Sequence, residues 1–217
     1  MADRIIQVLT PADSYDLLTL DEIKTMFGID PTDTSQDAQL QMYITSYSDV
    51  ISTFCNRVFA YEEVQETWTC VNFDDTNAMK RLFVSHYPLD PSYDIVVQNS
   101  AIGVFDPSTY AIEYPSGKIE LLNTIPSEPI TVTYAGGYDA PEAIPPALKQ
   151  AALLMIREAQ ALMMRFGISG IRSISHKESR VMYYDINQLL AKGPAGGVGL
   201  INSLANNLLM HYVRLEV

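Results

Sequence analysis

Residues 132–153 (VTYAGGYDAPEAIPPALKQAAL) join a predicted strand to a predicted helix through a short segment rich in glycine and proline. Apolar residues alternate with threonines before Gly136 and Gly137, as in a half-buried strand, and the two glycines let the backbone turn with positive φ. Pro145 and Pro146 fall where a helix begins, because proline fixes φ near the helical value and the first turn does not need its N–H. The pattern predicts a rigid junction between a β region and a helical region.

Amphipathic helices are predicted on both sides of the strand-rich part of the chain. The first spans about residues 20–27, opens with a capping box at Thr19 and ends at Gly28. Longer helices are predicted near residues 35–55 and 146–166, where apolar residues recur at steps of three and four. Such stripes are typical of packing surfaces, so we expect the two longer helices to pack together.

Residues 60–135 contain short strand-like segments separated by turn residues, with no helix between them. Six strands are predicted, at residues 64–71, 81–84, 95–98, 109–114, 118–122 and 130–134. A further short strand is predicted at residues 5–9. Runs of strands without helices form an antiparallel sheet or a small sandwich. We therefore predict an α+β fold: a helical bundle with an inserted antiparallel β domain and a hinged C-terminal segment.

The predicted domain boundaries follow from this order. Residues 1–59 and 139–192 form a discontinuous helical domain, residues 60–138 form the β domain, and residues 193–217 form a hinge and a terminal segment. The hinge sequence, GPAGGVG, lacks the spacing of phosphate-binding loops, so a flexible linker is the better interpretation. The hinge glycines are Gly193, Gly196, Gly197 and Gly199.

Charge is distributed unevenly along the chain. There are 26 acidic and 14 basic side chains, a net charge of −12. Residues 1–145 hold 22 acidic and 6 basic residues, net −16, whereas residues 146–217 hold 4 acidic and 8 basic residues, net +4. An acidic surface opposes tight binding to nucleic acid, which needs clusters of Lys and Arg. Alternatively, the acidic surface only keeps the protein soluble. Both interpretations stay open.

Motifs for catalysis or metal binding are not recognisable in the sequence. Cys55 and Cys70 fit neither a disulfide framework nor paired zinc ligands, so we expect reduced thiols. His86, His176 and His211 lie far apart in the sequence and lack the HxxxH spacing of metal sites. We predict that the protein is not an enzyme and holds neither a cofactor nor a metal.

Three polar clusters are interpreted as surface features. Ser175–Glu178 contains nucleophile and base types, but neighbouring side chains do not face one another, so we predict a solvated turn. The pairs Glu62–Glu63 and Asp74–Asp75 are predicted to be exposed charge.

Targeting and membrane signals are also weak. The N-terminal residues show no basic leader followed by an apolar stretch, and the longest apolar run, residues 151–156, is too short for a membrane span. With 47% hydrophobic and 18% charged residues, the composition is typical of a soluble globular protein. The lack of a secretory signal favours synthesis in the cytoplasm.

Three segments together resemble the head-tail connector, or adaptor, proteins of tailed bacteriophages and gene-transfer particles. They are ITVTYAGGYDAPEAIPPALKQAALLMI, GIRSISHKESRVMYYD and LANNLLMHYVRLEV. The similarity covers roughly residues 17–217 and is most specific at the junction from Gly136 to Pro146. The large β insertion departs from the short, all-helical members and leaves its own role open.

The resemblance implies a structural protein of the virion neck, made in the host bacterial cytoplasm. Neighbouring copies form a ring, typically dodecameric, beneath the portal protein. DNA passes through the lumen only as cargo, and the distal side binds the next neck, stopper or tail protein. No membrane is involved.

The terminal segment, residues 200–217, is predicted to dock on the portal. The preceding glycines let it leave the bundle, and apolar side chains left in water are costly. The docking residues are Leu204, Leu208, Leu209, Tyr212, Arg214 and Leu215. The alternative is that the segment folds back as a last helix on its own bundle.

Two functions from other classes stay open at this point. A stand-alone β binding module would need residues 60–138 to fold and bind alone. An enzyme, or a non-catalytic enzyme subunit, would show a polar pocket with a buried histidine or carboxylate whose pKa is strongly shifted.

Overall fold

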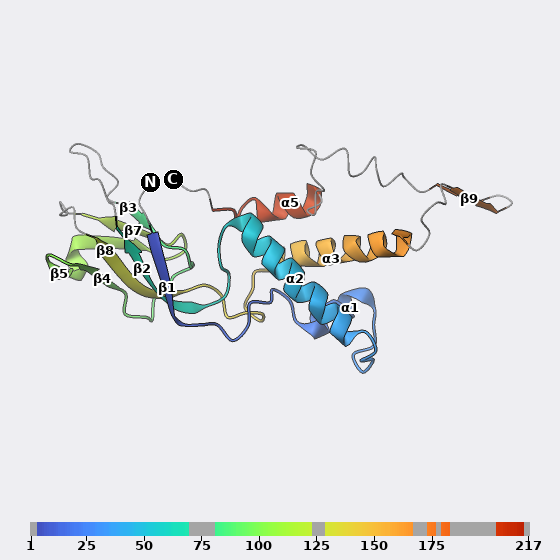
Figure 1. Cartoon of the computed structure of the whole chain (residues 1–217), viewed down its shortest axis with the longest axis horizontal. Coiled ribbons are helices and arrows are strands. Elements are labelled where there is room, and N and C mark those ends of the chain that lie inside the picture. The colour runs from blue at the N-terminus through green and yellow to red at the C-terminus, as the bar shows by residue number, and fades with distance from the viewer. Residues whose placement is uncertain are drawn as a thin grey trace.

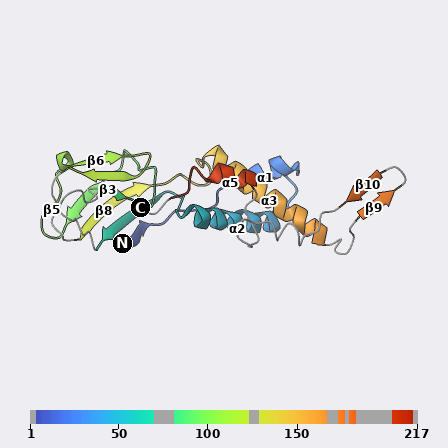
Figure 2. The same ribbon diagram turned by 90° about the horizontal axis from the view of Figure 1, so that it is seen from above.

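The computed structural model describes residues 4–69, 81–122, 129–166, 173–176, 179–182 and 203–214. A β region lies at one end and a helical region beside it, so the chain is elongated (Figure 1; Figure 2). The described helices are α1 (Leu20–Phe27), α2 (Asp37–Cys55), α3 (Pro146–Phe166) and α5 (Ser203–Leu209), with a 3₁₀ turn at Pro107–Thr109. The described strands are β1 (Arg4–Thr10), β2 (Glu62–Trp68), β3 (Arg81–Phe83), β4 (Val96–Asn99), β5 (Gly103–Val104), β6 (Tyr110–Glu113), β7 (Lys118–Leu121), β8 (Ile130–Gly136), β9 (Ser173–His176) and β10 (Ser179–Met182).

The first helix forms as its sequence predicts. The hydroxyl of Thr19 accepts a hydrogen bond from the Glu22 amide at 3.1 Å, and the Glu22 carboxylate accepts one from the Thr19 amide at 2.9 Å. Gly28 ends the helix with φ of 68°, in the left-handed region that favours glycine. The capping box and the glycine stop are therefore confirmed.

The helices share one apolar core. It includes Leu40, Ile44 and Ile51 of α2 and Leu148 and Ile156 of α3. Helix α5 also lies against α3, and its side chains at Ala205 and Leu209 are fully buried in the same core. The predicted packing of α2 on α3 is confirmed.

The β region contains two antiparallel sheets. The larger has the strand order β1-β2-β8-β4-β5, and the smaller has the order β3-β7-β6. In the larger sheet Val64 pairs with Tyr134, and β2 buries alternate residues. Val64, Val132, Ile119 and Leu82 from the two sheets form a second apolar core. All six strands predicted between residues 60 and 135 are present, although their ends differ by a few residues.

Three features of the β structure differ from the sequence prediction. Strand β1 pairs with β2, with Arg4 opposite Trp68, so part of the segment assigned to the helical domain joins the β region. The two-residue strand β5 was not predicted, because so short a strand has no period. Ser175 and His176 of the predicted solvated turn belong to β9, which pairs with β10, whereas residues 177 and 178 lie outside the described residues.

The α+β fold class is thus confirmed in the described residues. None of the described helices has the length and hydrophobicity that a membrane span requires. The hinge glycines Gly193, Gly196, Gly197 and Gly199 lie outside the described residues, as do Cys70 and Asp74–Asp75.

Candidate functional site

The junction between the two regions is built on Gly136 and Gly137. A Cβ atom on Gly136 would lie 2.5 Å from the carbonyl oxygen of His86. Gly137 has φ of +113°, and a Cβ atom there would lie 2.2 Å from the carbonyl oxygen of Ala60. These contacts are backbone atoms that cannot rotate away, so both positions require glycine. Pro146 then begins α3, as predicted.

Hydrogen bonds across the junction tie three segments together. The Tyr138 amide donates to the Phe59 carbonyl at 2.7 Å, and the Tyr61 amide donates to the Tyr138 carbonyl at 2.8 Å. The Gly137 amide donates to the Pro88 carbonyl at 2.9 Å. The chain that leaves the β region is therefore bound to the chain that enters it.

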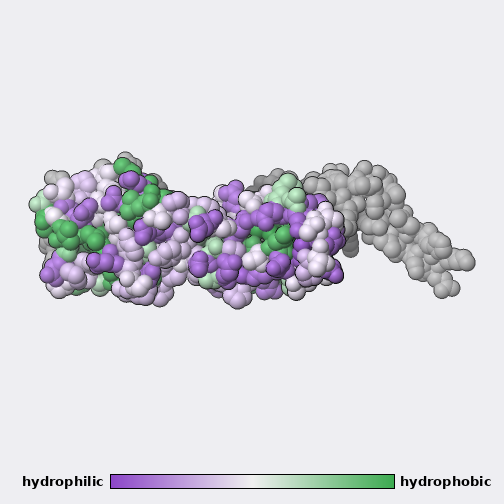
Figure 3. Space-filling model, turned by 90° about the horizontal axis from the view of Figure 1, so that it is seen from below, coloured by the Kyte–Doolittle hydropathy of each residue, from purple (hydrophilic) through white to green (hydrophobic). Residues whose placement is uncertain are grey.

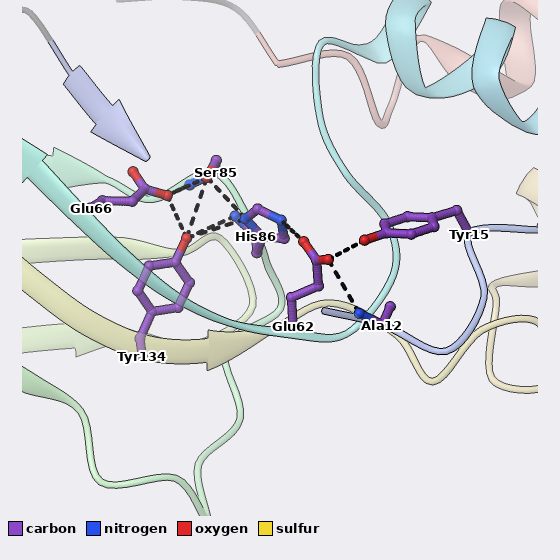
Figure 4. Close-up of polar contacts among 7 residues, drawn as sticks. All are labelled: Ala12, Tyr15, Glu62, Glu66, Ser85, His86 and Tyr134. Atoms are coloured by element: carbon purple, nitrogen blue, oxygen red, sulfur yellow. Dashed lines mark hydrogen bonds and ion pairs between the residues drawn. The ribbon is translucent and has the colours of Figure 1, made fainter. Parts of the chain in front are cut away.

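A buried polar cluster lies beside this junction (Figure 4). Its first half is centred on Glu66 of β2, whose side chain is fully buried. One carboxylate oxygen of Glu66 accepts hydrogen bonds from the Ser85 amide at 2.7 Å and the Tyr134 hydroxyl at 2.5 Å. The Ser85 hydroxyl also donates to this oxygen. Three segments far apart in sequence thus meet at one carboxylate.

The second half of the cluster is centred on Glu62, at the start of β2. Its carboxylate lies 2.8 Å from Nε2 of His86 and accepts a hydrogen bond from the Tyr15 hydroxyl at 2.5 Å. The Ala12 amide donates to the same carboxylate at 3.2 Å. Glu62 therefore binds the segment between β1 and α1 to the β region through hydrogen bonds.

Burial controls the charge states in this cluster. Loss of solvent lowers the pKa of His86, even though the neighbouring Glu62 carboxylate opposes the shift. Burial also raises the pKa of Tyr134, and the adjacent Glu66 carboxylate adds to the increase. The hydrogen bond to Glu62 raises the pKa of Tyr15. At neutral pH, His86 and the two tyrosines are therefore neutral donors to buried carboxylates.

Ser85, His86 and Glu62 superficially resemble a catalytic triad. The Ser85 hydroxyl lies 3.0 Å from Nδ1 of His86, whose Nε2 faces Glu62. However, Ser85 is 6% exposed and His86 is 2% exposed, and the serine hydroxyl already donates to Glu66. A nucleophile needs an open approach for its substrate and a free hydroxyl. The arrangement holds the fold together and has no access for catalysis.

A surface depression borders the cluster on the Glu62 side. Its lining includes Thr10, Asp13, Tyr61, Glu62 and Asp139, and it includes neither Ser85 nor His86. Among the described residues, no three His, Cys, Asp or Glu side chains converge as metal ligands would. The depression is acidic and has no built cation site.

The two described ends of the chain also meet at this cluster. Arg4 of β1 lies 3.7 Å from the second carboxylate oxygen of Glu66. Arg214 donates to the Phe83 carbonyl at 2.6 Å, and its amide donates to the Cys55 carbonyl at 2.9 Å. Burial lowers the pKa of Arg214, whereas Glu66 raises it. The N and C ends accordingly lie near each other beside the β region (Figure 1).

Stacked side chains complete the link between the two regions. Tyr212 packs edge-on against Phe59, with ring centres 6.2 Å apart. The guanidinium of Arg57 lies 4.7 Å from the centre of the Phe59 ring and 3.4 Å from that of Tyr87. Cation–π contacts of this kind are stronger when they are shielded from water. The segment after α5 therefore bridges the helical and β regions.

The residues predicted to dock on a portal lie in different environments, from fully buried to exposed. Leu209 is fully buried in the helical core, and Leu208 and Tyr212 pack against that core. Arg214 is bonded to the β region. The premise that these side chains lack local partners is therefore corrected, because α3 and Phe59 supply them. Leu204 is 54% exposed, and Leu215 lies outside the described residues.

The prediction that Glu62 is exposed charge is wrong. Glu62 is buried because β2 turns residues 62, 64, 66 and 68 toward the core. The sequence carried a signal for this: Val64 and Trp68 are apolar at the same period of two, which places Glu62 and Glu66 on their face. The partners His86 and Tyr134 left no comparable signal.

Comparison with known proteins identifies the family. Residues 16–157 match the head completion protein family. The chain belongs to the head completion protein family. Among curated proteins, none matches the sequence. The family assignment makes this a structural protein and not an enzyme, which confirms that expectation and agrees with the inaccessible serine and histidine.

The fold of this head completion protein recurs in solved neck structures. It is similar to a chain in the neck of an empty gene transfer agent (GTA) particle computed with C6 symmetry, with a TM-score of 0.55 and 13% identity. A chain in the virion of a native GTA particle gives a TM-score of 0.54 and 14% identity. A chain in the native GTA neck computed with C12 symmetry gives 0.50 and 13%. Each match covers 98% of this chain and 97% of the other.

Proposed function

We propose that this head completion protein is a head-tail adaptor in the neck of a phage-like or gene-transfer particle. Copies of the chain form a ring beneath the portal, DNA passes through the lumen, and the next neck, stopper or tail protein binds the distal side. One observation carries the proposal: a chain of the head completion family shares its fold, over 98% of its length, with a chain of a GTA neck.

The proposed ring contains twelve copies. The similar GTA neck structures were computed with C12 and C6 symmetry, and sixfold symmetry is contained within twelvefold symmetry. Closed rings are built from one kind of head-to-tail contact repeated around the axis. A ring of twelve satisfies both symmetries with a single type of contact.

The charge of the chain suits a channel for DNA. With a net charge of −12, each copy repels phosphate and gains little from counterion release. A lumen lined by such copies would let DNA pass without holding it. DNA is therefore cargo in this proposal and not a bound ligand.

Portal contact is assigned to the terminal segment, residues 200–217. Among the described residues of that segment, Leu204 offers an exposed apolar side chain, whereas Leu209 contributes to the core of its own molecule. Residues 193–199 would act as the hinge, and residues 60–138, extended by β1, would form the separate β domain. This division assigns portal binding to the helical side of the molecule.

A deletion experiment in the producing strain tests the proposed function. Particles made without this gene should show heads that lose DNA and tails that stay unattached, and a plasmid copy should restore complete particles. A matched plasmid that carries Gly137→Ala supplies a destabilised control. Complete, DNA-filled particles with attached tails in the deletion strain would contradict an adaptor role.

A further inference from the structure

Strand β1 is an edge strand with apolar side chains on both faces. Ile6 and Val8 lie opposite Glu66 and Val64, on the core face, Ile5 lies opposite Thr67 on the other face, and Leu9 lies where the register shifts. These four side chains are between 43% and 59% exposed. Natural edge strands are usually protected by lysine, proline or charge, because an open edge invites another strand. Apart from Arg4 at its start and a register shift between Val8 and Thr10, β1 has none of these protections.

The opposite edge of the same sheet has a similar character. It is formed by β5, where Val104 is 66% exposed and the preceding Ile102 is 56% exposed. The Phe105 amide donates to the Val97 carbonyl at 2.8 Å, so the edge extends to residue 105. Figure 3 shows hydrophobic surface in separate patches on the β region. The sheet thus presents apolar side chains at both of its open edges.

Neither edge carries charge in a chain that is strongly acidic. Residues 5–12 and 95–105 contain no Asp, Glu, Lys or Arg, although the chain has 26 acidic and 14 basic side chains. Copies with a net charge of −12 repel one another, and this repulsion is smallest where the touching surfaces are uncharged. The two sheet edges are therefore suitable places for copies to meet.

Strand direction is also compatible with a ring. All four neighbouring pairs in the sheet are antiparallel, so β1, β8 and β5 run the same way. Rotation about an axis along the strands keeps their direction, so β5 of one copy would meet β1 of the next in parallel. Such a contact joins two different surfaces, as every ring larger than a dimer requires.

We propose that copies join in the ring through opposite edges of the five-stranded sheet, with β1 of one copy beside β5 of the next. This inference rests on the proposed ring and assigns its lateral contact to the β region. Because β5 is short, each contact is weak alone and is completed when several copies gather on the portal.

Cysteine cross-linking in assembled particles tests the contact. Ile5→Cys and Val104→Cys are combined in one chain with Cys70→Ser, because the pairing register puts these two side chains on the same face of the sheet. The native Cys55 stays buried. After mild oxidation, the double variant should give a ladder of dimers and larger oligomers on non-reducing gels. Each single variant should give monomers. Val104→Cys with Met42→Cys, an exposed position on α2, is the matched control and should give no ladder.

Several results would overturn the inference. Dimers from Ile5→Cys alone would mean that β1 pairs with β1. Particles that contain the double variant at the normal level but show no ladder would reject the edge contact and leave the adaptor function standing. Wild-type particles that lack the protein would reject the adaptor function, and the inference with it.

A charge-swap series keeps the test decisive if the cysteine variants assemble poorly. Ile5→Lys alone and Val104→Glu alone should each lower incorporation into particles about tenfold, which corresponds to about 1.4 kcal/mol. The two changes in one chain should restore incorporation, because lysine and glutamate then meet across the contact. Normal incorporation of Ile5→Lys, or no restoration in the pair when both single variants fold, would overturn the proposal.

Discussion

The helical and β regions of this protein are stabilised in different ways. The helical core consists mainly of Leu, Ile, Ala and Met side chains, and Lys24 is buried there with its ammonium group 2.6 Å from Asp37. The β region instead places two carboxylates, Glu62 and Glu66, at core-facing positions beside Tyr134 and His86. A core of apolar volume tolerates small changes in shape, whereas a buried polar cluster depends on every hydrogen bond.

The polar cluster of the β region also lies where the two regions are joined. Glu62 accepts hydrogen bonds from residues 12 and 15, in the segment that leads from β1 to the helices, and Glu66 lies beside Arg4 of β1. Arg214, after α5, is bonded nearby to the Phe83 carbonyl. The buried cluster therefore links the two regions and also forms part of the β core. Trp68, the single tryptophan, lies in the β core and reports on that region by fluorescence.

The largest effect is expected from Glu66→Ala. The change leaves Ser85 and Tyr134 without their buried acceptor and Arg4 without its ion-pair partner, and breaking such a pairing costs about 3–5 kcal/mol. The urea midpoint followed by Trp68 fluorescence should fall strongly. Glu120→Ala, at an exposed salt bridge on β7, is the control and should change stability by less than about 1 kcal/mol. Equal effects of the two changes would show that the cluster does not stabilise the β region.

The corresponding change in the helical core is Leu209→Ala. Its side chain is fully buried against α3, so its loss should cost about 2–5 kcal/mol in unfolding followed by circular dichroism at 222 nm. Leu204→Ala, one turn earlier and 54% exposed, should leave stability nearly unchanged.

These two leucine variants also separate packing from portal binding. If the terminal segment docks as proposed, Leu204→Ala should weaken binding to the portal without lowering the melting temperature. Unchanged stability in Leu209→Ala would contradict the placement of α5 in the helical core.

The link between the regions is tested by Gly137→Ala. The strained φ and the close Ala60 carbonyl should together cost about 2–4 kcal/mol. Gly28→Ala is the matched control: it also has positive φ, but no atom lies within 4 Å of the added carbon, so it should cost about 1 kcal/mol. Equal losses in both variants would show that the junction is not tightly packed.

The smallest effect is a pH dependence confined to the β region. Because burial lowers the pKa of His86, the unfolded chain binds more protons than the folded chain below about pH 6.5. The contribution of neutral His86 to the free energy of unfolding is thus complete above that pH. The free energy of unfolding should fall as the pH drops from 6.5 to 5, by at most about 1.4 kcal/mol per pH unit.

The Trp68 midpoint in urea, measured at several pH values, checks this slope. His86→Gln should flatten it, whereas His211→Gln, at an exposed position, should leave it unchanged. An identical slope in the wild type and His86→Gln would assign the pH dependence to other groups.

Much of the fold could be predicted from local patterns. The bounds of α1 and α3 were predicted to the residue, because a capping box, a glycine stop and a proline start mark them chemically. Strand β5 could not be predicted, since two residues have no periodicity. The partner of β1 was also hidden, because Val64 lies more than fifty residues away.

The candidate site was predictable only in part. Gly136 and Gly137 were recognised because tight backbone turns select glycine in any context. The cluster of Glu62, Glu66 and His86 brings together separate segments, and the sequence does not say which of them meet. For the same reason, the apolar residues after α5 suggested an outside partner, although α3 of the same chain covers Leu209.

The most direct measurement is cryo-electron microscopy of the purified protein mixed with the portal protein of the same particle. We predict a ring of twelve copies beneath the portal, with the helical region toward the portal and an open lumen on the axis. Portal particles without added density, or density at a position other than below the portal, would contradict the proposed place of this protein in the neck.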